Sequence, residues 1–219
     1  MHYLQKYILD RLRFEQPLSY SAMLPDNVES SLFQYHLKLL QKDGLVEKQG
    51  RGIYALTHEG QAALEYMSIG RTTQVRMPKV ITYTLLTHKG QALLLRKQKE
   101  PYRNLLELIG GKLHFGESAE HAAQRDVHEK SGLSIPLPVL AGVANVMILQ
   151  QGKPLTHMIV YVHTRELAAL PQELPVTVQF YPTDSLAGRD DLAPTTLPLL
   201  NAIAARGKTP FVLTLNVEL

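Results

Sequence analysis

Residues 110–133 read GGKLHFGESAEHAAQRDVHEKSGL, and this segment is the most informative part of the 219-residue chain. Its paired glycines, Gly110 and Gly111, predict a loop that turns sharply and approaches neighbouring backbone closely. Ser118 can cap the helix that follows, and Gly132 can end that helix in a left-handed conformation. The segment therefore predicts a glycine-rich loop that leads directly into a helix.

Several carboxylates gather around this predicted helix. Asp126 and Glu129 are three residues apart and share one helical face, while Glu117 lies at the helix entrance. Clustered carboxylates repel one another unless a hard cation lies between them, and Mg²⁺ shared with substrate phosphates is the usual solution. Such an ion would neutralise a diphosphate and activate a water for attack. The alternative is that Arg125–Glu129 and Asp126–Lys130 are ordinary helix pairs, each worth about 0.2–0.5 kcal/mol.

The same segment resembles the Nudix box, a pattern of Gly, five residues, Glu, seven residues and then Arg-Glu-apolar-any-Glu-Glu-any-Gly-apolar. The matching positions are Gly111, Glu117, Arg125, Val127, Glu129, Gly132 and Leu133. The resemblance covers about residues 77–219 and implies an α/β/α sandwich with a mixed sheet. It also implies a hydrolase that uses Mg²⁺ (or Mn²⁺) to cleave a phosphoric anhydride bond in a nucleoside diphosphate linked to another moiety.

By this resemblance, the metal ligands would be Glu117, Asp126, Glu129 and the carbonyl of Gly111. Glu129 or Asp126 would act as the general base. Arg125 would complete the catalytic set by orienting the loop and Glu117. The residues alone indicate only that these acids gather at one helix.

Two positions depart from the box, because Asp126 and Lys130 stand where the pattern has Glu. Asp126 keeps the charge on a side chain that is one methylene shorter. Lys130 reverses the charge, so we expect fewer metal ions, a side chain that points away, or an ammonium that contacts phosphate directly. Lys130, Lys112 and Arg96 are therefore candidate substrate-binding residues, with ordinary surface charges as the alternative. Slow catalysis or none is also open.

The segments on both sides of the box have the periodicity and turn residues of an alternating strand and helix arrangement. Strands are predicted at residues 80–86, 91–96, 139–149, 156–164, 176–181 and 211–217, and a late helix at 195–205. Together with the helix of the box, these elements predict a sheet between helices.

The first 67 residues have mainly helical periodicity and predict a separate domain. Four helices are expected, with two short strands between the last two helices. The run YHLKLLQKDGLV from Tyr35 to Val46 resembles the recognition helix and wing entry of bacterial winged-helix regulators. We therefore expect an α+β chain with a winged helix-turn-helix domain at 1–67, a linker at 68–78 and a Nudix domain at 79–219.

A winged helix places its recognition helix in the major groove of DNA and its wing beside the phosphates or the minor groove. The candidate DNA-binding residues are Ser30, Ser31, Gln34, Tyr35, Lys38 and Arg51. Paired half-sites would also favour a homodimer. However, residues 1–76 contain nine basic and eight acidic residues, and DNA affinity grows with the number of phosphates neutralised. Docking of a protein partner is therefore the alternative.

The composition excludes several classes of protein. The chain has 45% hydrophobic and 20% charged residues, which is ordinary for a globular protein. It has no cysteine, which excludes thiol catalysis, thiolate zinc sites and iron–sulfur clusters. The net charge of +3 is too small to argue for nucleic acid by itself. No apolar run reaches the roughly 18 residues of a membrane helix, so we expect a cytoplasmic protein without a membrane partner.

Two functions remain in competition. The sequence favours a Mg²⁺-dependent Nudix-type hydrolase of a nucleotide-type small molecule, with regulation through double-stranded DNA as the reason for the fusion. The alternative is a transcriptional regulator whose Nudix domain senses a nucleotide with little or no catalysis. An interaction module with neither activity is a third reading.

Overall fold

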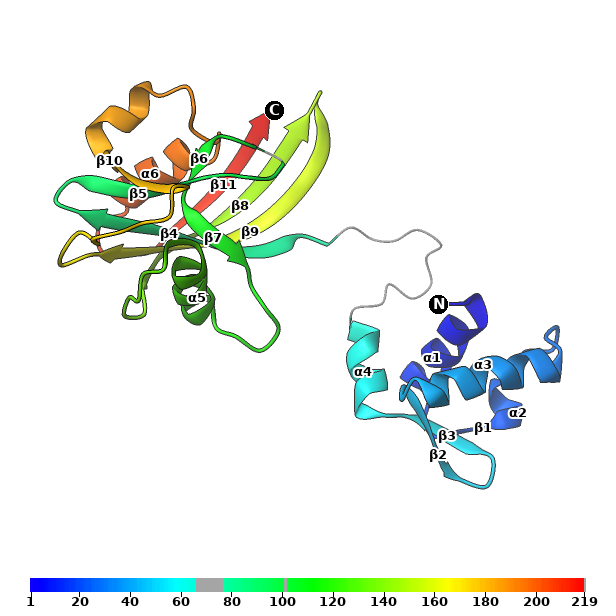
Figure 1. Ribbon diagram of the computed structural model, residues 1–219. Coiled ribbons are helices and arrows are strands. Elements are labelled where there is room, and N and C mark those ends of the chain that lie inside the picture. Colours follow the sequence, from blue (N-terminus) through cyan, green and yellow to red (C-terminus); the bar gives the residue numbers. More distant parts are fainter. Residues whose placement is uncertain (66–76, 101, 219) are drawn as a thin grey trace. The chain divides into compact units, whose positions relative to one another are not determined.

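The computed structural model describes residues 1–65, 77–100 and 102–218, and the chain divides into two compact units, Met1–Arg76 and Met77–Leu219 (Figure 1). Each unit has its own hydrophobic core, so the two are described separately. The linker predicted at 68–78 lies outside the described residues except for its last two positions. Within the described residues, no helix is long and apolar enough to cross a membrane.

The first unit combines four helices with a small antiparallel sheet. The helices are α1 (Tyr3–Phe14), α2 (Tyr20–Met23), α3 (Ser30–Lys42) and α4 (His58–Glu65). The strands are β1 (Leu18–Ser19), β2 (Val46–Gly50) and β3 (Ile53–Leu56), in the order β1-β3-β2. All but β1 were expected from the sequence. The two residues of β1 are too few to show a strand period, and they become a strand only by pairing with β3.

Helix α3 is amphipathic, and its apolar stripe builds the core of the first unit. The buried stripe consists of Phe33, His36, Leu37 and Leu40, at three- and four-residue spacing. Burial lowers the pKa of His36, as expected of a neutral histidine packed in a core. The opposite face of α3 is therefore left exposed.

The second unit is built on one mixed sheet. Its strands are β4 (Lys79–His88), β5 (Gln91–Arg96), β6 (Leu106–Glu107), β7 (Ile109–Lys112), β8 (Val139–Gln150), β9 (Lys153–Glu166), β10 (Val178–Pro182) and β11 (Phe211–Glu218). The helices are α5 (Ala119–Ser131), the short 3₁₀ helix η1 (Thr183–Gly188) and α6 (Thr196–Ala205). The strand order is β10-β5-β4-β9-β8-β11, with β6 beside β5 and β7 beside β4. The β4–β9 and β8–β11 pairs are parallel and the others antiparallel.

Helices α5 and α6 cover opposite faces of this sheet (Figure 1). Successive side chains of a strand point to opposite faces. Tyr83 and Leu85 of β4 share a buried cluster with Leu199 of α6, whereas Leu86 belongs to a second cluster with Val127 of α5. The second unit is therefore a mixed α/β structure with helices on both sides of a mixed sheet.

The prediction for the paired glycines is half right. Gly110 and Gly111 do not turn sharply, because both lie within β7 and pair with Tyr83 and Thr82 of β4. The close approach is confirmed: a Cβ on Gly110 would stand 1.9 Å from the carbonyl oxygen of Thr82, and one on Gly111 would stand 2.4 Å from Oδ1 of Asp126. Only hydrogen atoms fit between β7 and its neighbours here.

We expect Gly110→Ala to destabilise the second unit by about 1–3 kcal/mol, because the new methyl group overlaps backbone atoms that cannot move aside cheaply. The matched control is Gly188→Ala, where a Cβ would meet nothing within 4 Å. Urea denaturation followed by circular dichroism measures both variants. Equal stability of the two variants would contradict the packing argument.

Candidate functional site

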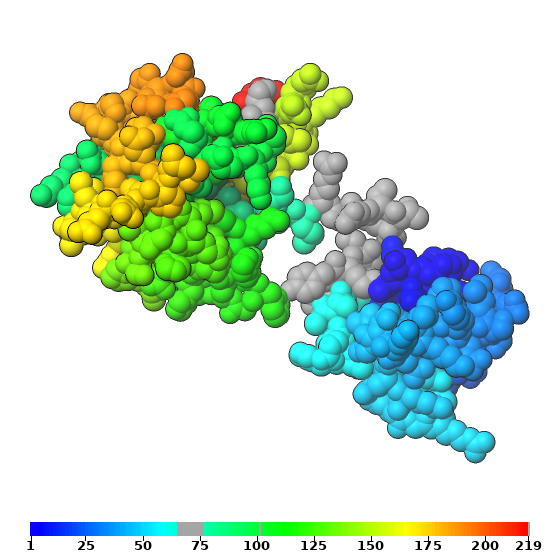
Figure 2. All heavy atoms as spheres, in the orientation of Figure 1, coloured from blue at the N-terminus to red at the C-terminus, as the bar shows by residue number. Residues whose placement is uncertain are grey.

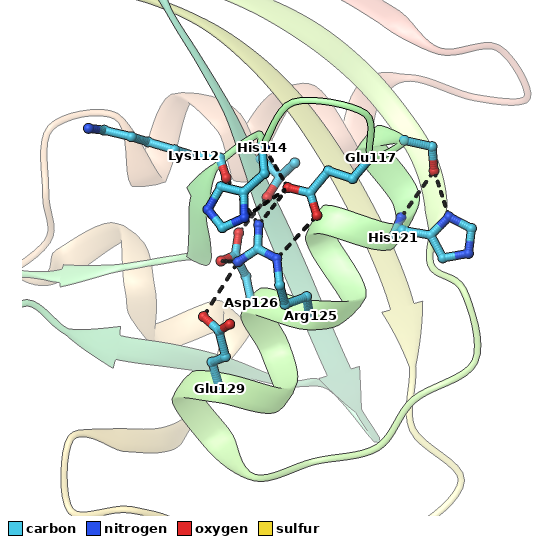
Figure 3. Close-up of polar contacts among 9 residues, drawn as sticks. Lys112, His114, Glu117, His121, Arg125, Asp126 and Glu129 are labelled. Carbon is cyan, nitrogen blue, oxygen red and sulfur yellow. Dashed lines mark hydrogen bonds and ion pairs between the residues drawn. The ribbon is translucent and has the colours of Figure 1, made fainter. Parts of the chain in front are cut away.

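The guanidinium of Arg125 lies at the centre of the polar contacts between β7 and α5 (Figure 3). Its Nε and Nη2 donate to the two carboxylate oxygens of Glu117, at 3.2 and 2.7 Å. Nη2 also donates to the carbonyl of Lys112 at 3.1 Å. Nη1 donates to Asp126 at 2.9 Å and to Glu129 at 3.4 Å. One side chain thus links a strand end, a loop and two turns of helix.

Glu117 is held at the start of α5 as a carboxylate. Besides the two contacts from Arg125, it accepts a hydrogen bond of 2.5 Å from the backbone nitrogen of His114. The hydrogen bonds from Arg125 are the main reason that the pKa of Glu117 falls to about 2. Ser118 caps α5 as predicted, by accepting from the backbone nitrogen of His121. Both carboxylate oxygens of Glu117 therefore have partners inside the protein.

Asp126 and Glu129 lie in different environments although they are close in sequence. The side chain of Asp126 is only 4% exposed, and its Oδ2 accepts a hydrogen bond of 2.9 Å from the hydroxyl of Thr82. Its carboxylate also packs against Gly111. The side chain of Glu129 is 56% exposed. Asp126 belongs to the buried stripe of α5, whereas Glu129 reaches solvent.

The arrangement of these acids does not fit a resident divalent cation. The described residues contain no group of three or more His, Cys, Asp or Glu side chains that could hold a metal ion. Glu117 and Asp126 direct their oxygens to Arg125 and Thr82, which leaves Glu129 as the freest carboxylate of the predicted set. In this structure, the positive charge among the three acids is supplied by the guanidinium of Arg125.

A pocket of about 780 Å³ lies next to these residues. Its walls include Gly110, Gly111, Lys112, Glu129 and Lys130, together with residues of β4, β5, β8 and β9. Six of the lining side chains are Lys or Arg and three are Glu. The basic residues are Lys79, Arg96, Lys97, Lys99, Lys112 and Lys130. The pocket is thus suited to an anionic ligand.

The three predicted substrate-binding residues all line this pocket, but they differ in whether they already have partners within the protein. Arg96 is engaged by the protein, because its guanidinium donates to Asp191 at 2.9 Å and to the carbonyl of Asn104 at 2.6 Å. Lys112 is exposed. Lys130 is half-buried and, among the described residues, makes no hydrogen bond or ion pair. Burial lowers the pKa of Lys130, an effect that Asp126 and Glu107 oppose.

Glu107 is a pocket residue that was not predicted from the sequence. It is 6% exposed. Its Oε2 accepts a hydrogen bond of 3.1 Å from the hydroxyl of Tyr83 and forms an ion pair of 3.2 Å with Lys97. Burial and the charge of Glu107 raise the pKa of Tyr102 to about 12. The sequence does carry a signal for this residue, because Glu107 is the one acid inside the apolar run LLELI at 105–109. A charge buried in such a run requires a partner within the protein.

In the first unit, the predicted DNA-contacting residues lie on exposed surface. One face of α3 carries Ser31 and the residues three, four and seven positions after it, Gln34, Tyr35 and Lys38. All four are exposed. Ser30 and Ser31 also have partners within the protein, Tyr20 and Glu29. Arg51 is exposed in the turn between β2 and β3, and Figure 2 shows this cyan turn protruding from the first unit. Helix face and turn are therefore accessible.

Comparison with known proteins places the second unit in a family. The NUDIX domain family matches residues 75–200, so the chain belongs to this family through its C-terminal unit. The NUDIX domain of Shewanella oneidensis NrtR complexed with ADP ribose is similar in fold, with 16% identity and a TM-score of 0.51 over 65% of this chain and 97% of that one. The MutT protein from Methanosarcina mazei Go1 is similar at 19% identity and a TM-score of 0.50, over 62% and 99%.

We expect Glu117→Gln to lower stability at pH 7 by about 1–3 kcal/mol, because it removes the charge that Arg125 binds. The depressed pKa of about 2 means that this stabilisation is present above pH 4.5 and is lost as the pH falls towards 2. The difference between wild type and variant should therefore shrink over that window. Chemical denaturation at a series of pH values measures it.

The control for this prediction is Glu173→Gln, in an exposed loop of the same unit. This variant should track the wild type at every pH. A Glu117→Gln deficit that persists unchanged at pH 2 would contradict the ion-pair explanation.

Proposed function

We propose that the C-terminal unit binds a nucleoside diphosphate linked to another group, and that this binding regulates an N-terminal winged helix-turn-helix domain. The observation that carries the proposal is the pocket of about 780 Å³ with six basic side chains and a single acid of the box, Glu129, on its wall. A volume in the range of 300–1,000 Å³ is typical of small-molecule sites. The charge balance supports anion binding more strongly than it supports catalysis.

A nucleotide-type ligand is also the choice that the fold comparison supports. The similar NUDIX domain of NrtR is complexed with ADP ribose. This makes ADP-ribose the first compound to try with the present chain, followed by nucleotide sugars and nucleoside triphosphates.

Hydrolysis is the second candidate function, and the position of Glu129 favours it. Among the acids of the box, Glu129 alone lines the pocket, and its side chain is more than half exposed. A carboxylate in that place can accept a proton from a water that attacks phosphorus. Arg125 would then act as a positioning residue for Glu129 and Glu117.

A ligand screen distinguishes the two candidates. We expect one nucleotide to raise the melting temperature of the full-length protein saturably, because a ligand at 100 times its Kd stabilises by about 2.7 kcal/mol. Cleavage of the same compounds is measured with Mg²⁺ and with Mn²⁺ by chromatography of the nucleotide products, because hydrolysis of a linked diphosphate yields two phosphate monoesters rather than inorganic phosphate. Slow or absent turnover by a stabilised protein is the outcome that the sensor function predicts.

The variant Glu129→Gln completes the screen. If turnover occurs, it should fall in this variant while binding is kept, whereas unchanged turnover would remove Glu129 from the catalytic role. Efficient turnover by the wild type would replace the sensor with the hydrolase. Absence of stabilisation by every nucleotide would contradict both functions.

For the N-terminal unit, we propose that α3 lies in the major groove of DNA and that the β2–β3 turn is the wing. The exposed face of α3, from Ser31 to Lys38, has the length of about two helical turns and carries amide, hydroxyl and ammonium groups. Arg51 extends the basic surface to the wing. Binding to two half-sites would require a homodimer.

We expect Lys38→Ala to weaken binding to DNA from the region upstream of the protein's own gene, and to reduce the slope of log K against log salt by about 1, because one phosphate contact is lost. Arg13→Ala, on an exposed part of α1, is the matched control and should leave the slope unchanged. Fluorescence anisotropy at several salt concentrations measures both. Binding that is absent or independent of salt would favour protein docking instead.

A further inference from the structure

The pocket of the C-terminal unit contains Lys130 where the Nudix box has an acid, and this cation has no hydrogen bond or ion pair among the described residues. We propose that this chain binds the diphosphate of its ligand without a divalent metal ion, and that the ammonium of Lys130 supplies the charge a metal would otherwise bring. This inference rests on the proposed nucleotide-binding function and deepens it. It concerns the same pocket but makes a separate claim about what neutralises the phosphates.

The acids of the box already have hydrogen-bond donors within the protein. Arg125 contacts Glu117, Asp126 and Glu129 within 3.4 Å. Asp126 has a further donor in Thr82, and Glu117 has one in the backbone of His114. Neither Glu117 nor Asp126 lines the pocket. A metal ion entering the pocket would therefore meet Glu129 as the single acid of the box on its wall, beside Glu100 and Glu107.

A metal ion at Glu129 would also meet the positive charge of Lys130. Lys130 follows Glu129 directly, lines the same pocket and makes no hydrogen bond or ion pair within the described residues. An ammonium beside a divalent cation is repelled by it, so Lys130 opposes metal binding at Glu129. The exchange of an acid for Lys changes the local charge by two units.

Lys130 also favours an anionic ligand in the pocket. Lys130 is half-buried on the pocket wall, so its ammonium is only partly accessible to water in the free protein. A phosphate oxygen would give this ammonium the partner that the described part of the chain does not provide. Lys112 and Lys97 line the same pocket, and Glu107 and Tyr102 hold Lys97 in place.

Two consequences separate this mode of binding from a metal-bridged one. Affinity should not depend on free Mg²⁺ or Mn²⁺, because no ion links the phosphates to the protein. It should depend on Lys130, because a desolvated ammonium–phosphate contact contributes a large part of the binding free energy.

The test measures ADP-ribose binding to the full-length protein by calorimetry, in buffer with EDTA and in buffer with Mn²⁺. Wild type should bind with the same Kd in both. Lys130→Met should bind about 10- to 100-fold more weakly in both, and Lys130→Arg should keep most of the affinity. Lys208→Met, on an exposed loop away from the pocket, is the matched control and should bind like wild type.

A second readout uses the metal alone. The electron paramagnetic resonance signal of free Mn²⁺ should be unchanged by wild-type protein, whereas Lys130→Glu, which restores an acid beside Glu129, should reduce it. Melting curves of each variant show that it is folded.

The outcomes separate the inference from the function on which it rests. Wild-type binding that requires Mn²⁺, or equal binding by Lys130→Met and wild type, would overturn metal-free recognition and leave nucleotide binding intact. If ADP-ribose, ADP and nucleoside triphosphates all fail to bind in either buffer, the proposed function fails and the inference falls with it.

Discussion

The guanidinium of Arg125 organises the region where strand, loop and helix meet. A planar group with five donors can contact several carboxylates and a carbonyl at once, which a lysine ammonium cannot do in the same geometry. Here the donors bind the strand end at Lys112, the loop at Glu117 and two successive turns of α5. The orientation of α5 relative to β7, and therefore the shape of the pocket wall, follows from this set of contacts.

The close packing of β7 makes that set of contacts possible. The absence of side chains at Gly110 and Gly111 lets the strand approach Thr82 and lets the carboxylate of Asp126 lie against it. Asp126 then reaches the hydroxyl of Thr82 across the interface between helix and sheet. A buried carboxylate is tolerated here because each of its oxygens has a donor. The contacts of Asp126 thus depend on the absence of side chains at Gly110 and Gly111.

The charged residues of this region form two groups, one that pairs with Arg125 and one that lines the pocket. Arg125 pairs with acids that a metal site would need, while Lys130 and other basic residues line the pocket. Membership of the NUDIX domain family sets the fold of the C-terminal unit. The charge of individual residues on that fold decides whether the pocket holds a cation or an anion. In this chain the balance supports an anion-binding pocket and, in the proposed function, a ligand-sensing role.

The order and type of most elements were predictable from the sequence, because hydrophobic period and capping residues act locally. Ser118 and Gly132 bound α5 as expected. The spacing of Glu117, Arg125 and Glu129 also located the candidate site. Strands β1 and β7 were not predictable in this way, since short or glycine-rich segments become strands only by pairing with a distant partner.

Tertiary structure alone decided which side chains remain free. The sequence determines that four acids and two Lys or Arg residues occur in and beside one helix, but the pairing of each acid depends on distances set by packing between α5, β4 and β7. Glu107 lies outside the box and contacts Tyr83 and Lys97 in the pocket. Arg96 is bound by Asp191, which comes from a much later segment. Local sequence determines the elements and the inventory of charges. Long-range packing decides how those charges pair, because electrostatic energy depends on separation and burial that no short segment specifies.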